Sequence, residues 1–555
     1  MGEASSKDTG QLALGVALGL ATLLALPFGL GQALLLAGGH IAPLPAAIVL
    51  AAAISVSVLV AWRAGGTWVA PLAAAAIVLV ATAGSALIID TSHDGQEYHF
   101  DAVSALAQGW NPYEGAEPEP GRVKLAGPLP EWAGHYPQGA WIPSALQVTL
   151  GLSYEAAKSQ PLIILAALFL AVLGAGRRLG LGKLKANLVA VLAAANPIIL
   201  VQLFSRLNDG MLGACLALMA TFAALWLLTP SRWAVLGVVA PLILAVNLKF
   251  SGIPSAAGIC ALICAFALAL RGWKPALRVA AILVAAGLVG VLVLGAHPYV
   301  TNVQRNGHPF YPLMGPGHAD IMTGNRPEWF RHEPPIQRMA ASYFGATTSG
   351  YAGDEHFKAP FTLERPEIRA AGQYDVRIGG FGPLFSGALV LALALGGACA
   401  LQRPASVAAT RLLAGAGGVL ALAVIMPEAW WARYVPQIWW VAVLVALACL
   451  VSRSKVQRTG GWILAAVLIA NAGLVGASSA RTSVERTLDV RRQLAQMRRE
   501  PGMICLYPSF YHARLSLLGD ISQKIRIRKE PLKGCKVVPL AGTYAEWKAG
   551  YCPCP

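Results

Sequence analysis

Long runs of uncharged apolar residues constrain this chain more than any other feature. Four of them are Leu72–Ile89, Leu162–Gly176, Leu212–Leu228 and Leu384–Leu401. Each is close to the roughly 20 residues that an α-helix needs to cross a bilayer. The whole chain is 56% hydrophobic and only 13% charged, which is far fewer charges than soluble domains carry. The sequence therefore predicts an integral membrane protein.

Polar breaks between the apolar runs divide the chain into about thirteen spans. The predicted spans lie at about 12–37, 43–62, 68–90, 160–176, 188–204, 211–228, 233–248, 251–270, 279–297, 383–401, 409–426, 436–452 and 460–478. Two polar loops, at about 91–158 and 298–382, interrupt this membrane module of residues 1–480. Residues 481–555 form a separate tail whose alternating segments predict strands. The predicted fold is an all-α polytopic membrane protein with a small α/β or α+β C-terminal domain.

The placement of Lys and Arg predicts the orientation, because short cytoplasmic loops are rich in these residues. A cytoplasmic N-terminus puts the following residues in cytoplasmic loops: Arg63, Arg177, Arg178, Lys183, Lys185, Arg232, Arg271, Lys274, Arg278, Arg403, Arg411, Arg453, Lys455 and Arg458. Both large loops and the tail then face outward. The net charge of +16 is explained by these clusters and the basic tail. It therefore does not indicate a nucleic-acid partner. The high Ala, Gly and Arg content favours a bacterial plasma membrane, with a periplasmic or extracellular C-terminus.

The first large loop opens with acidic residues at helical spacing. Asp94, Glu97, Tyr98 and Asp101 stand at i, i+3, i+4 and i+7, so a helix over 94–108 places them on one face. Repulsion among the three carboxylates raises at least one pKa toward the range of a general base. A solvated acidic face without chemistry is the alternative. We favour the base, because the helix directly follows a span and so lies at the level of lipid headgroups.

Several motifs of this chain look like those of one enzyme family. Asp94, Tyr98 and His99, followed by GWNPY at 109–113, open the first outward loop in a pattern that resembles the GT-C glycosyltransferases. Similar motifs are HYPQG at 135–139, NLKFSG at 247–252, NGHPFYP at 306–312 and ARYVP at 432–436. Two features depart from the family pattern. Three predicted spans precede the acidic loop instead of one, and Gly95 and Gln96 separate the two acids that are adjacent in several members.

The resemblance implies a membrane glycosyltransferase. Such an enzyme moves a sugar from a polyprenyl-phosphate-linked donor to a glycan, lipid or protein acceptor of the cell envelope, with inversion at the anomeric carbon. Family members place a catalytic Asp or Glu at the start of this loop. Asp94 is the best match for the general base and Glu97 the second, with His99 and Asp101 in support. No cofactor is required by the pattern, and a divalent metal near these acids is an open possibility.

Isolated basic residues in outward turns are candidates for the donor phosphate. Arg433, Lys249 and Arg206 each stand at the outward end of a predicted span, and a charge beside hydrocarbon is costly. The alternatives are side chains that reach lipid headgroups, or a simple pair between Arg206 and Asp209. For the sugar, Tyr98 and the second-loop residues Asn306, His308 and Tyr311 combine polar groups with aromatic faces. A loop that folds over the membrane surface explains the second-loop segment equally well.

Four of the nine cysteines lie in the tail, at Cys505, Cys535, Cys552 and Cys554. Four cysteines in an outward segment predict two disulfides in an oxidising compartment. The connectivity stays open, although Cys552 and Cys554 are poorly placed to pair with each other. A metal site is disfavoured because no histidine accompanies them.

Two other functions remain open from the sequence. A polysaccharide polymerase or ligase that uses pyrophosphate-linked glycans would place its essential arginines in the loop at 298–382. A transporter or flippase of lipid-linked glycans would need ionisable groups at mid-membrane and related halves. The predicted spans hold few charges and no evident repeat, so an enzyme with its chemistry in the loops is favoured.

Overall fold

The computed structural model describes residues 2–118, 129, 131–349, 356–402, 406–509, 511–530, 534–543 and 548–554. The described part is mostly helical, with one small sheet near the C-terminus. The first helices are α1 Gly2–Leu36, α2 Pro43–Gly65, α3 Val69–Leu87, α4 His93–Gln96, α5 Tyr98–Ala107, α6 Glu131–His135, α7 Trp141–Thr149, α8 Gln160–Arg178, α9 Lys183–Ala194, α10 Pro197–Gln202 and α11 Asp209–Leu228. The others are α12 Arg232–Leu248, α13 Gly252–Arg271, α14 Trp273–Leu288, α15 Thr301–Asn306, α16 Ile321–Asn325, α17 Pro335–Tyr343, α18 Arg365–Ala370, α19 Phe385–Leu401, α20 Val407–Val424, α21 Ile438–Leu450 and α22 Lys455–Arg499.

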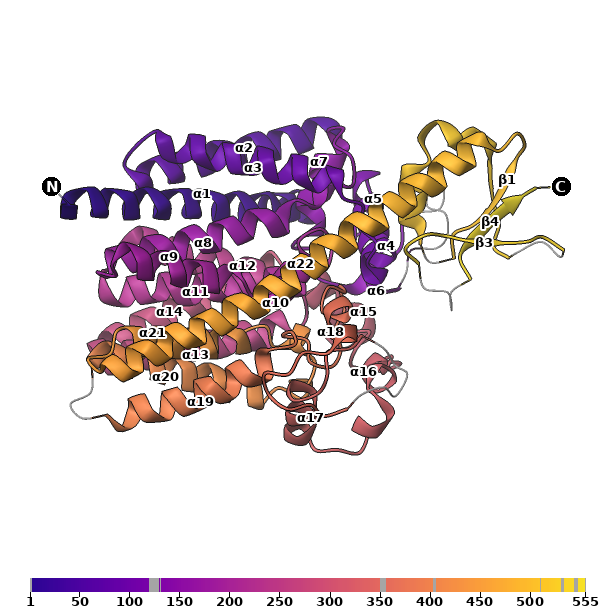
Figure 1. The fold of residues 1–555 in the computed structure, drawn as a ribbon. Coiled ribbons are helices and arrows are strands. Elements are labelled where there is room, and N and C mark those ends of the chain that lie inside the picture. Colours follow the sequence, from indigo (N-terminus) through magenta and orange to yellow (C-terminus); the bar gives the residue numbers. More distant parts are fainter. Residues whose placement is uncertain are drawn as a thin grey trace.

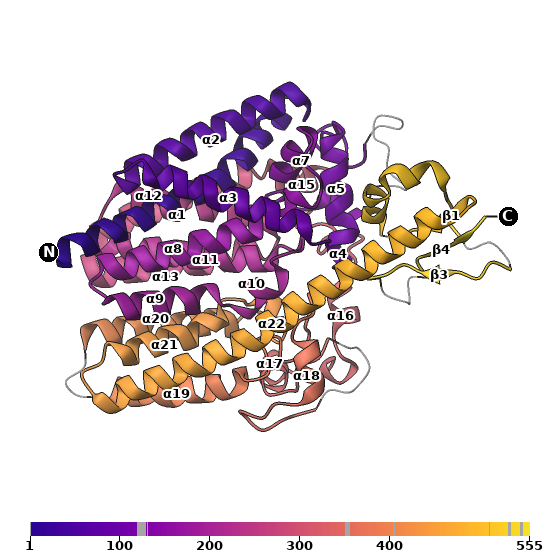
Figure 2. The ribbon, with the colours of Figure 1, turned by 45° about the horizontal axis from the view of Figure 1, so that its top comes forward.

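The long helices lie side by side in one bundle (Figure 1). The short helices α4–α7 and α15–α18 gather at one end of it, which we call the loop end, and the C-terminal sheet lies beyond them (Figures 1 and 2). The N-terminus lies at the opposite end. Because successive predicted spans run in alternating directions, the two large loops and the tail should lie on the same side of the membrane. In the structure all three lie at the loop end of the bundle.

Nine helical segments of the described residues are long and apolar enough to cross a membrane. Three further apolar helices, α12, α19 and α21, have between 10 and 17 residues. These elements are compatible with a membrane protein, whereas the count of thirteen spans stays a prediction. The predicted span at 188–204 is interrupted, because α9 ends at Ala194 and α10 starts again at Pro197. Proline cannot donate to the helix ladder, and the side chain of Asn196 caps the new helix by accepting from the amide of Ile198.

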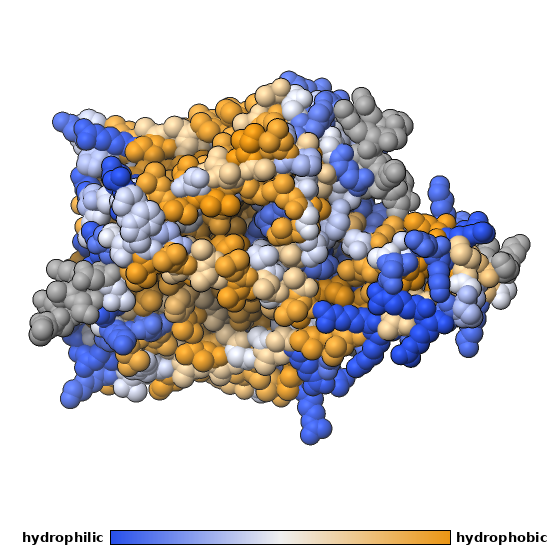
Figure 3. Space-filling model, turned by 90° about the horizontal axis from the view of Figure 1, so that it is seen from above, coloured by the Kyte–Doolittle hydropathy of each residue, from blue (hydrophilic) through white to orange (hydrophobic). Residues whose placement is uncertain are grey.

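A broad apolar belt surrounds the bundle. Figure 3 shows hydrophobic residues over the middle of the molecule and hydrophilic residues toward both ends. Only 22% of the apolar segment of α3 and 17% of that of α14 is buried against other parts of the chain. Exposed apolar area on this scale is rare on soluble monomers. It supplies the surface that lipid tails cover in a membrane protein.

The last long helix crosses the boundary predicted at residue 480. α22 runs unbroken from Lys455 to Arg499 and links the bundle to the sheet. The sheet contains β1 Ile504–Tyr507, β2 Ile525–Ile527, β3 Val538–Pro539 and β4 Gly550–Pro553, in the order β2-β1-β4-β3. β1 pairs with β2 in parallel and with β4 in antiparallel orientation. Disulfides join Cys505 to Cys554 and Cys535 to Cys552.

Close packing of α1 on α2 depends on glycine. A Cβ atom added to Gly15 in α1 would lie 2.4 Å from the Cα of Gly65 in α2. Two helix backbones approach this closely only where neither residue carries a side chain. The same addition to Gly84 in α3 meets nothing within 4 Å.

We expect Gly15→Ala to lower the thermal unfolding midpoint of the detergent-purified protein, because overpacking costs roughly 1–3 kcal/mol. Gly84→Ala is the matched control, since it makes the same change at an open helical position and should leave the midpoint unchanged or slightly higher. Equal midpoints for the two variants would show that α1 and α2 do not pack as closely as described.

Candidate functional site

A single guanidinium joins three segments at the loop end of the bundle. Arg433 lies in a short 3₁₀ turn, Ala432–Tyr434, between α20 and α21. Its Nε lies 3.0 Å from Oδ2 of Asp209, its Nη2 lies 3.1 Å from Oδ2 of Asp94, and its Nη1 lies 3.3 Å from Oδ1 of Asp375. The three carboxylates raise the pKa of Arg433 against the opposing effect of its burial. We call these four residues the Arg433 cluster.

The inner side of the Arg433 cluster is closed by Lys249. Its Nζ lies 2.5 Å from Oδ1 of Asp209 and 3.9 Å from the centre of the Tyr434 ring. Asp209 is the first residue of α11, and the side-chain amide of Gln202 donates to it at 3.0 Å. Asp209 is only 1% exposed. Its carboxylate is therefore saturated by protein donors and serves to position the two cations.

The outer side of the Arg433 cluster is open. The side chains of Asp94 and Asp375 are 26% and 23% exposed. The indole of Trp431 donates to Asp375 at 3.1 Å, and Arg377 lies 3.7 Å from the same carboxylate. Burial raises the pKa of Asp94, but the charge of Arg433 and its hydrogen bond lower it below the ordinary value of 3.8. Asp94 is thus an ionised carboxylate that external molecules can reach.

Glu97 has a different environment, because the predicted helix over 94–108 breaks at this residue. α4 ends at Gln96 and α5 begins at Tyr98, with Glu97 at φ −91° and ψ −113°. The single helix was therefore a wrong prediction. Burial, with the charges of Asp94 and Asp101, raises the pKa of Glu97 to about 7. The sequence argument that repulsion moves one of these carboxyls into the general-base range applies to Glu97.

Asp101 faces away from Arg433 and contacts the C-terminal domain. Its Oδ2 lies 2.8 Å from Nδ1 of His512, in the 3₁₀ segment His512–Leu517. Asp101 is 1% exposed, and its carboxylate raises the pKa of His512 against the effect of burial. Its predicted catalytic support does not fit this position. The pair instead holds the C-terminal domain on α5, and a contact between the side chains of His93 and Tyr511 at 3.3 Å does the same on α4.

His99 also departs from its predicted catalytic role. The indole of Trp141 donates to its Nδ1 at 2.7 Å, and the residue is 2% exposed. Burial lowers the pKa of His99 to about 3. A neutral imidazole whose Nδ1 already accepts a proton donor cannot serve as a base through that atom. His99 therefore serves to position the rings of Tyr98, Tyr136 and Trp141, on which it packs.

An aromatic wall runs from Asp94 to the second large loop. Tyr98 packs on Tyr136 with ring centres 5.8 Å apart, Tyr136 on Phe250 at 5.1 Å, and Phe250 on Phe310 at 5.7 Å. These rings come from both loops and from the turn that carries Lys249. Burial and the charge of Asp94 hold the pKa of Tyr98 well above its ordinary value. Tyr98 is thus a neutral ring and hydroxyl beside the exposed carboxylate.

The predicted second-loop residues lie at the far end of this wall. Asn306 contacts Nδ1 of His135 at 3.4 Å, and Tyr311 packs edge-on against the His135 ring and donates to Glu131. His308 accepts from the amide of Phe310 at 3.1 Å. The structure thus brings the HYPQG and NGHPFYP segments together. None of the three second-loop residues contacts the Arg433 cluster.

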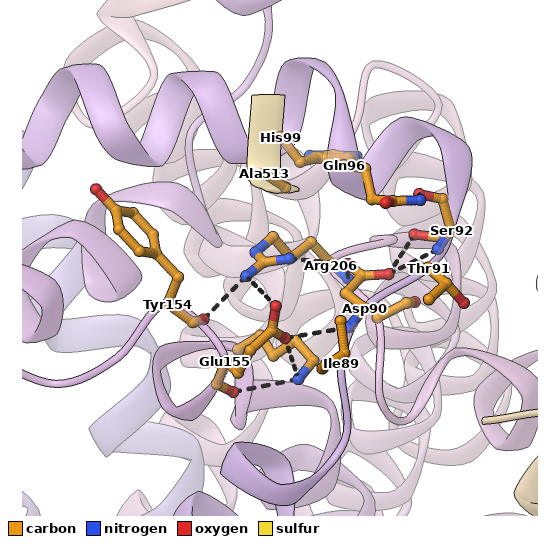
Figure 4. Close-up of polar contacts among 12 residues, drawn as sticks. Ile89, Asp90, Thr91, Ser92, Gln96, His99, Tyr154, Glu155, Arg206 and Ala513 are labelled. Carbon is orange, nitrogen blue, oxygen red and sulfur yellow. Dashed lines mark hydrogen bonds and ion pairs between the residues drawn. The ribbon is translucent and has the colours of Figure 1, made fainter. Parts of the chain in front are cut away.

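Arg206 belongs to a separate, closed cluster (Figure 4). It lies 3.2 Å from Asp90 and 3.4 Å from Glu155, and Lys158 lies 2.6 Å from the other side of Glu155. The side chains of these four residues are at most 9% exposed. Lys158 and Arg206 lower the pKa of Glu155 to about 2, against the effect of its burial. The proposed pair with Asp209 is therefore wrong, and the position does not suit a donor phosphate.

The described residues contain no group of three or more His, Cys, Asp and Glu side chains that could hold a metal ion. The three aspartates of the Arg433 cluster converge on a guanidinium, so a cation there would meet a positive charge. These residues do not fit a divalent metal, and we derive no step from one.

Sequence reasoning missed Asp209 and Asp375 as partners of Arg433, and Tyr136 and Phe250 as parts of the wall. A signal was available for Tyr136 and Phe250, which lie inside the HYPQG and NLKFSG motifs. Comparison of the chain with protein-family models, with curated proteins and with solved structures finds no match.

We expect Arg206→Met to lower the free energy of unfolding by about 3–5 kcal/mol, because it leaves buried Asp90 and Glu155 short of a cation. Thermal unfolding in detergent measures the effect. Arg492→Met removes an exposed pair with Asp489 and should leave the midpoint unchanged. An unaltered midpoint for Arg206→Met would mean that the closed cluster does not stabilise the fold.

Proposed function

We propose that this protein is an integral membrane glycosyltransferase of the GT-C type. It takes a sugar from a polyprenyl-phosphate-linked donor and passes it to a hydroxyl of a cell-envelope glycan, lipid or protein. The observation that carries this proposal is Asp94, an exposed carboxylate that Arg433 holds beside the aromatic wall. The position is at the loop end, next to the apolar belt, where a lipid-linked headgroup and a water-soluble acceptor can meet.

The proposal includes a membrane topology. The chain crosses the bacterial plasma membrane thirteen times, with the N-terminus in the cytoplasm and the loop end in the periplasm or outside the cell. The clusters of Lys and Arg in the loops away from the loop end support this orientation. α9 and α10 together form the span that proline interrupts.

Asp94 is the general base in this proposal. Its carboxylate accepts the proton of the acceptor hydroxyl while the hydroxyl oxygen attacks the anomeric carbon. The bond between that carbon and the phosphate oxygen breaks, so that polyprenyl phosphate leaves and the configuration inverts. The glycosyl group is the only part of the donor that is transferred, and the proton of the acceptor hydroxyl ends on Asp94. Glu97 is farther from this role, because it pairs with His93 at 3.5 Å and faces Asp101 and His512.

The charges of the Arg433 cluster supply the second part of the mechanism. Each guanidinium nitrogen of Arg433 is paired with an aspartate before reaction. A proton on Asp94 neutralises that carboxylate and weakens its pair with Nη2. At the same step the phosphate gains a negative charge as the sugar leaves. Arg433, held by Asp209 and Asp375 and supported by Lys249, then turns its freed N–H groups to the leaving phosphate.

The aromatic wall is the proposed sugar site. Tyr136 and Phe250 are buried, so Tyr98 and Phe310, the partly buried rings at the two ends of the wall, are the ones whose faces contact the apolar side of a sugar ring. Asn306, His308 and Tyr311 lie farther along the wall, where they suit the more distant part of the acceptor. In this arrangement Tyr98 contacts the transferred sugar, and the second-loop residues contact the acceptor.

The polymerase or ligase alternative has less support. It requires arginines in the loop at 298–382 that a ligand can reach. Arg326 pairs with Glu428, Arg377 donates to Asn325, and Arg338 donates to the carbonyl of Pro427. Arg365 and Arg369 of the same loop are exposed. Arg326 and Arg338 hold the loop on the turn that precedes Arg433, and Arg377 joins two parts of the loop to each other. Their positions suit a structural role better than recognition of a pyrophosphate.

We expect Asp94→Asn to reduce the release of polyprenyl phosphate from polyprenyl-phospho-sugars by about 10²–10⁴-fold, because the amide cannot accept the proton. The assay uses membranes with acceptor present, and protein amounts are matched by immunoblot. Asp489→Asn, at an exposed position of α22, is the control and should retain full activity. Equal release by wild type and Asp94→Asn rejects Asp94 as the base, and no release by wild type from any donor rejects the proposed reaction.

The pH dependence separates Asp94 from Glu97. Asp94 stays ionised to below pH 3.8, so kcat/KM for the wild type should not change between about pH 5.5 and 8. Glu97 has a pKa of about 7, so a base at that position would lose activity as the pH falls through 7. We expect Glu97→Gln to leave the flat profile unchanged. A rising limb near pH 7 that Glu97→Gln abolishes would move the base to Glu97.

A further inference from the structure

A second candidate site lies at the end of the bundle opposite the loop end. A cavity of about 190 Å³ opens between α1, α2, α8, α11 and α12. Its lining residues come from the start of α1, the ends of α2, α8 and α11, and the start of α12. Figure 3 shows the apolar belt giving way to hydrophilic residues at both ends of the molecule, and the lining of this cavity includes both apolar residues and two arginines.

The rim of this cavity carries two arginines. Arg63 is in the last turn of α2 and Arg178 is the last residue of α8. Neither forms an ion pair with a carboxylate among the described residues. The guanidinium of Arg63 stacks 4.7 Å from the ring centre of Trp62, which itself stacks on Trp68. The rim thus presents positive charge that is partly oriented before any ligand binds.

The wall of the cavity is amphipathic. Leu14, Leu18, Phe222 and Leu225 line it from α1 and α11, and Trp233 lines it from α12. Polar groups of Gln11, Thr229 and Ser231 also line it, and none of the lining residues whose side chains the structure describes is a carboxylate. Apolar side chains beside two arginines and three polar side chains suit a ligand with an anionic head and an apolar tail.

We propose that this cavity binds the headgroup of an acidic phospholipid, with phosphatidylglycerol as the representative chemistry. Arg63 and Arg178 pair with the phosphate, since guanidinium groups bind phosphate oxygens in a bidentate manner. The polar lining residues receive the glycerol hydroxyls, and the first part of an acyl chain lies along α1 and α11. Basic pockets between spans at the cytoplasmic side are suited to such headgroups.

The position separates this site from sugar transfer. Asp209 of the Arg433 cluster is at the start of α11, and its partner Lys249 directly follows α12. The cavity lies at the opposite ends of the same helices, the end of α11 and the start of α12. The cavity is therefore not part of the donor site. The proposal concerns a structural lipid of the leaflet at this end and does not depend on the proposed reaction.

Native mass spectrometry of the detergent-purified full chain tests the proposal. Phosphatidylglycerol or phosphatidylcholine is added to the delipidated wild type, to the double variant Arg63→Ala/Arg178→Ala, and to the control Lys274→Ala/Arg278→Ala. The control removes two exposed charges from α14 at the same end of the bundle. We expect one retained phosphatidylglycerol on the wild type and the control, at least about tenfold weaker binding by the double variant, and little retention of phosphatidylcholine.

A second measurement reports the site of binding. Phosphatidylglycerol with brominated acyl chains should quench the fluorescence that Trp233 contributes, taken as the difference between wild type and Trp233→Phe. Matched thermal midpoints exclude misfolding of the variants. Equal losses in both double variants, equal retention of phosphatidylcholine, or no quenching of Trp233 would each overturn the proposal. Tighter binding of polyprenyl phosphate than of phosphatidylglycerol would also overturn it, because the site would then belong to the carrier lipid.

Discussion

The pairing of Arg433 with three aspartates is the interaction on which the loop end depends. Asp94 comes from the first large loop, Asp209 from the start of α11, and Asp375 from the second large loop. A charge removed from water remains favourable only when its partners are fixed in place. Each segment is therefore held in one position by the other two. Arg326 pairs with Glu428 and thereby holds the segment that leads to Arg433.

The two ionic clusters differ in one property that separates structure from function. The side chains of the Arg206 cluster are at most 9% exposed, and every carboxylate in it is paired with protein donors. The Arg433 cluster has the same chemistry, but Asp94 and Asp375 remain open to solvent. A cluster this buried serves to stabilise the fold, because its side chains offer a ligand little surface to contact. An open one can exchange a proton or a partner at the surface, which is why the proposed chemistry is assigned there.

The sequence was informative where a feature depends on neighbouring residues and uninformative where it depends on distant ones. Uncharged runs such as Leu72–Ile89 identify long apolar helices, and acids at Asp94 and Glu97 mark the first loop as a candidate site. The pairing of Arg433 with Asp209 joins residues 224 positions apart, so no local pattern predicts it. Arg206 was misassigned for the same reason. Its neighbour Asp209 is close in sequence, but Asp90 and Glu155 reach it through tertiary packing.

The break at Glu97 determines how many carboxylates the site presents. An unbroken helix would place Asp94 and Asp101 on one face, seven residues apart, and direct both toward the same partner. The two short helices instead turn Asp94 to Arg433 and Asp101 to His512. The first loop is thereby fixed on two sides, by the bundle and by the C-terminal domain. Asp94 thereby gains a fixed partner, while Glu97, whose side chain is 20% exposed, stays close enough for the charges of Asp94 and Asp101 to raise its pKa. A local irregularity, which propensity alone does not predict, therefore gives Asp94, Glu97 and Asp101 three different environments.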